Sequence, residues 1–141
     1  MLSPTKRKYI FTIYELGNAG NSVRSTDISN ALGVKKASVS LMLPKLIGES
    51  LVERTESGGV ALTSAGAVLG GELYLKYLTL FKFFKDVLKS TDENARRDSI
   101  CCLCALTDEN TESMTNYILR QHNIKEFAKE EMNEHCNSGR A

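Results

Sequence analysis

The residues whose chemistry is easiest to interpret are basic and hydroxyl-bearing side chains between positions 24 and 54. Ammonium groups, guanidinium groups and serine hydroxyls suit the phosphates of DNA, which position a protein on the duplex but do not specify sequence. Leu41, which lies among them, cannot hydrogen-bond to a base edge but could pack on a thymine methyl group, so direct readout from this stretch is expected to be sparse. The predicted DNA contacts are Arg24, Lys35, Lys36, Ala37, Ser38, Ser40, Leu41, Lys45 and Arg54.

Cysteine is the second residue type that could do chemistry. Three of the four cysteines, Cys101, Cys102 and Cys104, lie within four residues of one another. If this run is helical, Cys101 and Cys104 share a face. Such a pair could be a redox couple or half of a thiolate metal site. No basic residue in the run would lower a thiol pKa, so the interpretation we favour is that these cysteines are small buried apolar residues.

A catalytic set is not recognisable. The only two histidines, His122 and His135, lie in the last fifth of the chain. No glycine-rich phosphate loop of the P-loop or dinucleotide-binding type is present in the sequence. The sequence therefore predicts a protein that is not an enzyme.

Two short helical patterns separated by a glycine must position the lysines. In the first, a hydroxyl of Ser25 or Thr26 can cap the helix. Gly33 follows, where the end of a helix favours a left-handed residue. The second helix is expected to begin near Lys36, and Pro44 predicts a kink or an early end, because proline removes a backbone donor. The side chains expected on its buried side are Val39, Met42 or Leu43, and Leu46.

Two strand-like runs, 51–54 and 60–62, follow the helical pair, with Gly58 and Gly59 in the turn between them. The whole pattern predicts a winged helix-turn-helix, a motif that usually reads DNA. A long pattern from Ser64 toward Lys89 is too apolar for a helix with one buried stripe, so a subunit partner is expected to cover part of it. The expected architecture is mainly α, with a winged helix-turn-helix DNA-binding domain at 1–66, a helical dimerisation domain at 67–122 and a polar, disordered tail at 123–141.

Composition limits the class of protein. The chain has 141 residues and a formal net charge of only +1, so it is not a bulk polycation. The first 62 residues contain eight basic and five acidic side chains. This modest excess of positive charge suits a lobe that faces DNA. No apolar run approaches the ~20 residues of a membrane span, and the N-terminus lacks the apolar core of a signal peptide. A cytoplasmic protein without a membrane partner is therefore expected.

Several motifs carry a resemblance to a known family. They are Ser3-Pro4, Tyr9-Ile10, Ile13-Tyr14, Val23 to Ile28, Ala31 to Val34, Ala37 to Ser40, Leu51-Val52, Gly59 to Thr63 and Ala105 to Thr107. In these residues the chain resembles the iron- and manganese-dependent repressors, the family of the diphtheria toxin repressor and the manganese transport regulator. The resemblance implies a homodimer that binds palindromic operators in double-stranded DNA, with a divalent manganese or iron ion as the effector.

The resemblance also indicates the positions at which members of the family have their metal ligands. In this chain those positions hold residues of other types. These positions are Lys8, Phe11, Tyr77, Ile100, Leu103 and Cys104. Among them only Cys104 has a side chain that ligates first-row divalent ions, while Lys8 could place an ammonium group near where the metal would sit. No metal or other cofactor is therefore expected, and manganese or iron remains the alternative that the family offers.

The sequence thus predicts a cytoplasmic, homodimeric, DNA-binding transcriptional regulator whose usual metal site is lost or rebuilt. One alternative keeps DNA binding but replaces the metal by a small-molecule or redox input, the latter at Cys101 and Cys104. The other alternative is a winged helix that serves only as a protein-interaction module. DNA affinity that is absent, or that does not fall steeply with added salt, would favour this module.

Overall fold

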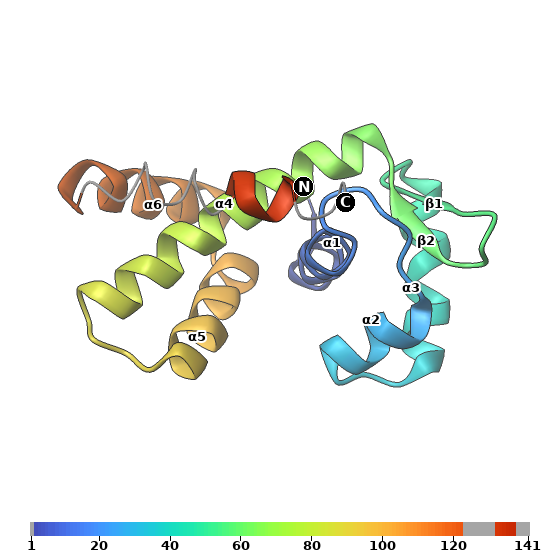
Figure 1. Ribbon diagram of the computed structural model, residues 1–141, viewed down its shortest axis with the longest axis horizontal. Coiled ribbons are helices and arrows are strands. Elements are labelled where there is room, and N and C mark those ends of the chain that lie inside the picture. Colours follow the sequence, from blue (N-terminus) through green and yellow to red (C-terminus); the bar gives the residue numbers. More distant parts are fainter. Residues whose placement is uncertain (1, 123–131, 138–141) are drawn as a thin grey trace. The chain divides into compact units, whose positions relative to one another are not determined.

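The structure is a computed structural model, in which residues 2–122 and 132–137 are described (Figure 1). It divides into two compact units, Met1–Glu72 with His135–Ala141, and Leu73–Glu134. The division falls inside a long helix, α4 (Ser64–Asp86), rather than at residue 66, where the sequence suggested a boundary. The fold is mainly helical, as predicted, with one two-stranded sheet among the described residues.

The first unit is built on α1 (Pro4–Leu16). The side chain of Ser3 accepts a hydrogen bond from the backbone N–H of Lys6 at 3.2 Å, and proline occupies the first helical position. This helix buries almost its whole apolar face and packs against α2 and the second strand. Its buried apolar side chains are Tyr9, Ile10, Phe11, Ile13 and Tyr14.

The helices α2 (Ser25–Leu32) and α3 (Lys36–Gly48) form the predicted helix-turn-helix (Figure 1). Gly33 follows α2 with φ 65° and ψ 32°, in the left-handed region that a glycine adopts without steric cost. The buried side chains of α3 are Val39, Leu43 and Leu46.

Two local predictions about these helices are wrong. Arg24 is the N-cap of α2 and makes no side-chain cap bond, so neither Ser25 nor Thr26 caps this helix. The helix α3 does not end early, because it continues through Pro44 to Gly48. The burial of side chains on both sides of the proline outweighs the loss of one backbone hydrogen bond on the exposed side of the helix.

The wing consists of β1 (Val52–Arg54) and β2 (Val60–Leu62), which pair antiparallel with Glu53 opposite Ala61. Gly58 has φ 88° in the connecting loop, which Figure 1 shows projecting beyond the two strands. Both the strands and the turn glycine agree with the prediction from the sequence.

The first turns of α4 approach the rest of the first unit very closely at two glycines. A Cβ atom on Gly66 would lie 1.9 Å from the carbonyl oxygen of Leu51, and one on Gly70 would lie 2.7 Å from the ring of Tyr14. Position 66 therefore requires glycine because the backbone of Leu51 leaves no room for a Cβ atom, and not because of an unusual backbone angle.

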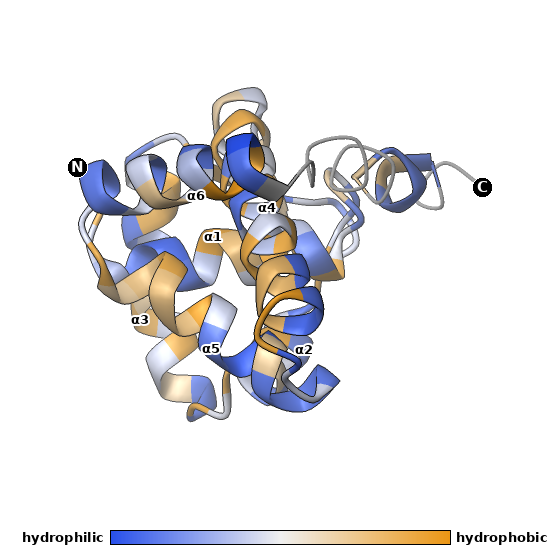
Figure 2. Cartoon of the chain, turned by 90° about the vertical axis from the view of Figure 1, so that its left-hand side faces the viewer, coloured by the Kyte–Doolittle hydropathy of each residue, from blue (hydrophilic) through white to orange (hydrophobic). Residues whose placement is uncertain are grey.

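The second unit contains the remainder of α4 with α5 (Asp92–Ala105) and α6 (Asp108–His122). Thr91 caps α5, because its hydroxyl accepts from the backbone N–H of Asn94 at 3.2 Å, and the hydroxyl of Thr107 accepts from the N–H of Asn110 at the start of α6. Figure 2 shows hydrophobic and hydrophilic residues in succession along the helices, as expected of amphipathic elements. One apolar cluster joins Leu80, Ile118, Phe83, Phe84, Cys102, Met114 and Leu119.

The predicted disordered tail falls partly outside the described residues, at 123–131 and 138–141. Its described part, 132–137, is helical, whereas the polar composition led us to expect a weak helix that frays into disorder. Cys136 Sγ lies 3.4 Å from the hydroxyl of Tyr14, and the ring of His135 stacks on that of Tyr14 at 6.0 Å between centroids. These contacts with α1 explain why this polar segment forms a helix. They could not be predicted from composition, because α1 is far away in the sequence.

Within the described residues, no helix combines the length and the apolar character that crossing a membrane requires.

Candidate nucleic-acid interface

The exposed side of α3 gathers most of the predicted DNA contacts. Three fully or almost fully buried side chains of α3 face the core and fix the rotation of the helix about its axis. The remaining side chains are thereby directed toward solvent. Those predicted as DNA contacts are all exposed: Lys35, Lys36, Ala37, Ser38, Ser40, Leu41 and Lys45.

This exposed surface is basic and contains no acidic group. The stretch 34–48 carries Lys35, Lys36 and Lys45 and no aspartate or glutamate. With 1.5 Å of rise per residue, Lys36 and Lys45 are about 14 Å apart along the helix axis. That separation is similar to the ~12 Å width of the major groove of B-DNA, so the two ends of α3 can meet the phosphates that border the groove.

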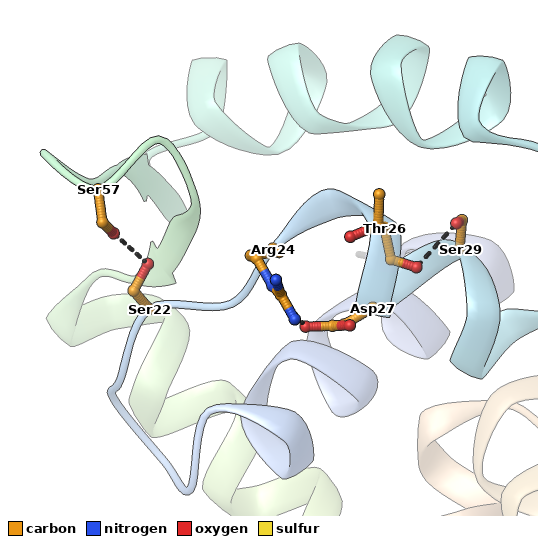
Figure 3. Close-up of polar contacts among 6 residues, drawn as sticks. All are labelled: Ser22, Arg24, Thr26, Asp27, Ser29 and Ser57. Atoms are coloured by element: carbon orange, nitrogen blue, oxygen red, sulfur yellow. Dashed lines mark hydrogen bonds and ion pairs between the residues drawn. The ribbon is translucent and has the colours of Figure 1, made fainter.

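The wing is anchored to the segment before α2 by a contact that the sequence did not indicate. Val23 and Val60 form an isolated antiparallel bridge, in which each N–H donates to the other carbonyl at 2.7 and 2.8 Å. A hydroxyl cluster adds to it, because Ser22 Oγ lies 2.8 Å from Thr55 Oγ1. Ser22 Oγ also lies 3.2 Å from Ser57 Oγ, the contact drawn in Figure 3. These contacts fix the direction of the wing relative to the helix-turn-helix.

Two arginines lie beside this framework. Arg54, in β1, is exposed next to the wing loop, as expected for a phosphate contact. Arg24 Nε donates to Asp27 Oδ2 at 3.2 Å, with 79% and 43% of the two side chains exposed (Figure 3). An exposed ion pair of this kind contributes at most about 1 kcal/mol, so Arg24 can exchange Asp27 for a phosphate at little cost.

In the first unit, neither residue at a predicted metal-ligand position offers a ligand. Lys8 is exposed on α1, and Phe11 is 1% exposed in the core. The ammonium of Lys8 stays a hypothetical substitute for the ion's charge.

In the second unit, the position that the resemblance assigns to a histidine holds Tyr77, a buried residue. Its hydroxyl accepts a hydrogen bond from Arg96 Nη1 at 3.1 Å, and the Arg96 guanidinium carbon lies 5.6 Å from the centre of its ring. Arg96 could not be identified from the sequence, because it lies on α5 while Tyr77 lies on α4, and no local pattern connects the two residues. A permanently charged guanidinium beside the phenol oxygen disfavours a metal cation there.

The three remaining ligand positions lie on α5. Ile100 is half-buried, Leu103 is buried, and Cys104 is the one member with a donor atom suited to a transition metal. In the parts of the chain that the structure describes, no group of three or more His, Cys, Asp or Glu residues could hold a metal ion. The residues at these positions therefore do not fit the carboxylate and imidazole set that the resemblance implies.

The cysteines of α5 differ in their surroundings. Cys101 is exposed, Cys102 is half-buried and Cys104 is buried. Burial, with smaller contributions from Cys101 and Asp98, raises the pKa of the Cys102 thiol. Because only thiolates are strongly nucleophilic, this environment does not favour a reactive Cys102, and Cys101 and Cys104 do not share an exposed face.

The geometry described above defines the class of the protein as a winged-helix protein with an exposed, basic second helix. Comparison with known proteins agrees with it. The family model described as "Iron dependent repressor, N-terminal DNA binding domain" matches residues 1–60. The HTH-type transcriptional regulator MntR of Geobacillus kaustophilus is 31% identical over 98 residues, which cover 70% of this chain and 69% of the relative. MntR of Oceanobacillus iheyensis is also 31% identical over 98 residues, covering 70% of this chain and 66% of the relative.

Among solved structures, that of the manganese regulator SloR is 27% identical with a TM-score of 0.64, over 82% of this chain. The chain spans about half of the SloR chain, since the alignment covers 55% of it. This protein belongs to the iron- and manganese-dependent repressor family, a family of DNA-binding transcriptional regulators.

Proposed function

We propose that this protein is a transcriptional regulator that binds double-stranded DNA by placing α3 in the major groove and the wing on the adjacent backbone. The observation that carries the proposal is the exposed face of α3, which has lysines near both ends and no acidic residue. In helix-turn-helix proteins the second helix enters the major groove, and basic side chains beside it bind phosphates.

In this arrangement the individual residues have separate tasks. Lys35 and Lys36 at the start of α3, and Lys45 near its end, bind phosphates on the two borders of the groove. Arg54 on the wing binds a phosphate further along the duplex, and Arg24 joins them after release from Asp27. These contacts position the helix but carry no sequence information.

The active form that we propose is a homodimer on a palindromic operator. Two-fold symmetric dimers are the commonest oligomers, and they match the two-fold symmetry of a palindromic site. Apolar side chains that stay exposed in the second unit, such as Leu88 at 54% and Tyr117 at 57%, supply surface that a second copy could cover. The compartment that fits this role is the cytoplasm, and no catalytic role is proposed.

The relatives named above include a manganese regulator, but the ligand positions here hold residues that do not fit a manganese or iron site. We therefore propose that DNA binding by this protein is independent of both metals. The burial of Cys104 and the raised pKa of Cys102 do not support a thiol switch, so the alternative to metal control is a small-molecule effector.

The first test is fluorescence anisotropy of the full-length, chelator-treated protein with duplex DNA from its own promoter region. Titrations at several salt concentrations, repeated with Mn²⁺ and with anaerobic Fe²⁺, should give tight, salt-sensitive binding that the metals do not change. Replacing Lys36 or Lys45 by alanine should weaken binding and lower the salt slope by about one. Lys76→Ala, on α4 outside the proposed interface, is the matched control for loss of one charge.

The outcomes separate the candidate functions. Binding that appears only with metal would overturn metal independence but not DNA binding. Absent or salt-insensitive binding would overturn the regulator itself and favour a winged helix that binds another protein.

A further inference from the structure

We propose that α3 selects its DNA site through contact between Leu41 and thymine methyl groups, rather than through hydrogen bonds to base edges. This inference rests on the proposed function, because it concerns the same helix in the same groove. It adds the chemical feature of the DNA that the helix would recognise.

The first observation is the position of Leu41. It is 71% exposed, the largest exposed fraction among the large hydrophobic side chains in the described residues. A single exposed leucine is common on protein surfaces and by itself indicates nothing. Leu41, however, lies on the exposed side of α3, between Lys36 and Lys45 in the sequence, where the proposed DNA contact would bury it.

The second observation is an apolar stripe around this leucine. Ala37 lies four residues before it and Pro44 three residues after it, so the three side chains are neighbours on one side of the helix. All three are exposed. The continuation of α3 through Pro44, which the sequence did not predict, is what places the proline ring on this stripe.

The third observation is the set of polar side chains that the exposed face lacks. Discrimination by hydrogen bonding uses Arg or Lys for guanine, Asn or Gln for adenine, and Asp or Glu for cytosine. The stretch 34–48 contains no Arg, Asn, Gln, Asp or Glu. Its lysines lie near the ends of the helix, and the hydroxyls of Ser38 and Ser40 hydrogen-bond to any base without strong preference.

These observations favour one partner chemistry. Among the unmodified bases, thymine alone presents a methyl group in the major groove, and apolar side chains recognise it by burial. The flanking lysines identify the occupant of this surface as a polyanion, and the apolar centre selects among its sequences. The preferred site should thus contain thymine at the position beneath Leu41.

The experiment removes the methyl group without altering base pairing. Sites are first selected from a randomised double-stranded DNA library with the full-length protein. Each thymine of the selected site is then replaced singly by 2′-deoxyuridine, and binding is measured by anisotropy. We expect about fourfold weaker binding at the contacted thymine, the loss that follows from removing one buried methyl-sized group. Thymines elsewhere in the same duplex serve as internal controls.

Variants connect this effect to the leucine. Leu41→Ala should bind thymine and deoxyuridine duplexes equally, because truncation removes the contacting atoms. Leu41→Met, which keeps the apolar contact, should retain the preference. Val68→Ala is the matched control, since it shortens another strongly exposed apolar side chain, at 65%, on α4.

The results distinguish this inference from the proposed function. Sequence-selective, salt-sensitive binding with no thymine preference would overturn the methyl readout and leave the regulator intact. A thymine preference that survives in Leu41→Ala would also overturn it, because another group would then read the methyl. If the library yields no bound duplex, both the inference and the proposed function fail.

Discussion

Gly66 offers the sharpest test of how α4 is joined to the first unit. Replacing this glycine by alanine adds one methyl group at a place where no atom fits. The new Cβ would lie 1.9 Å from the carbonyl oxygen of Leu51 and 3.2 Å from a side-chain carbon of Leu62. The first of these contacts involves backbone, which cannot rotate away as a flexible side chain can.

The magnitude follows from this geometry. To reach an ordinary separation of about 3.4 Å, the start of α4 and the residue at Leu51 must move apart by more than 1 Å. The same carbonyl accepts the backbone N–H of Thr63 at 3.1 Å, so the movement also weakens that hydrogen bond. Overpacking costs about 1–3 kcal/mol and a lost hydrogen bond about 1 kcal/mol. We expect a loss of about 3 kcal/mol in the free energy of unfolding, which corresponds to a fall of roughly 12 °C in Tm.

The assay is thermal unfolding followed by circular dichroism, with urea unfolding as a second measure. Gly48→Ala is the matched control, because it makes the same chemical change at the end of α3, where a Cβ would meet nothing within 4 Å. It should leave stability unchanged or raise it by up to about 1 kcal/mol. Equal stability of the two variants would refute the reasoning, since the close approach at Gly66 would then carry no energetic penalty.

Three further predictions follow from local geometry. Gly33→Ala should cost about 1 kcal/mol in urea unfolding although space is available, because φ there is 65°, and Gly33→Asn should cost less. Ser3→Ala and Thr91→Ala should each cost about 1 kcal/mol by removing a helix cap, with serine at position 91 restoring most of it. Cys102 should be alkylated more slowly than the exposed Cys101 when iodoacetamide labelling is followed by mass spectrometry near pH 8. Because its folded-state pKa is raised, the stability that protonated Cys102 contributes is present at lower pH and is lost as pH rises through that pKa.

The helix-turn-helix and the wing could be predicted because their signals are local. The cap of α1 at Ser3, the left-handed Gly33 and the turn at Gly58 each depend on residues within a few positions. The spacing of apolar residues in α3 is equally local, and it determines which face of this helix is buried and which is exposed. The predicted DNA contacts on α3 follow from that spacing.

The start of α2 could not be predicted because a distant residue decides it. The bridge between Val23 and Val60 holds the chain extended up to Arg24, which has φ −81° and ψ 144°. The helix therefore begins at Ser25. Ser25 is then the first helical residue and not the N-cap, so its hydroxyl does not occupy the capping position. No sequence pattern connects position 23 with position 60.

Pro44 shows a similar limit. Proline in a helix removes one hydrogen bond and costs about 3 kcal/mol. Ser40, whose carbonyl loses that bond, lies on the exposed side where water can replace it. Leu43 and Leu46 are 3% and 0% exposed, and burying two leucines contributes about 3–6 kcal/mol. The comparison favours a continuous helix, but it requires knowledge of burial that a local rule lacks.

The altered ligand positions lead to a final expectation about metals. Phe11 and Leu103 are each 1% exposed, so these positions contribute apolar burial where the family resemblance would place ligands. Tyr77 already accepts from a charged guanidinium, which opposes a cation. An ion that bound the folded state at one hundred times its Kd would stabilise it by about 2.7 kcal/mol and raise Tm by several degrees. We expect no such rise with Mn²⁺ or anaerobic Fe²⁺, and a metal-specific rise that Cys104→Ala abolishes would show that a new site has been built around that thiol.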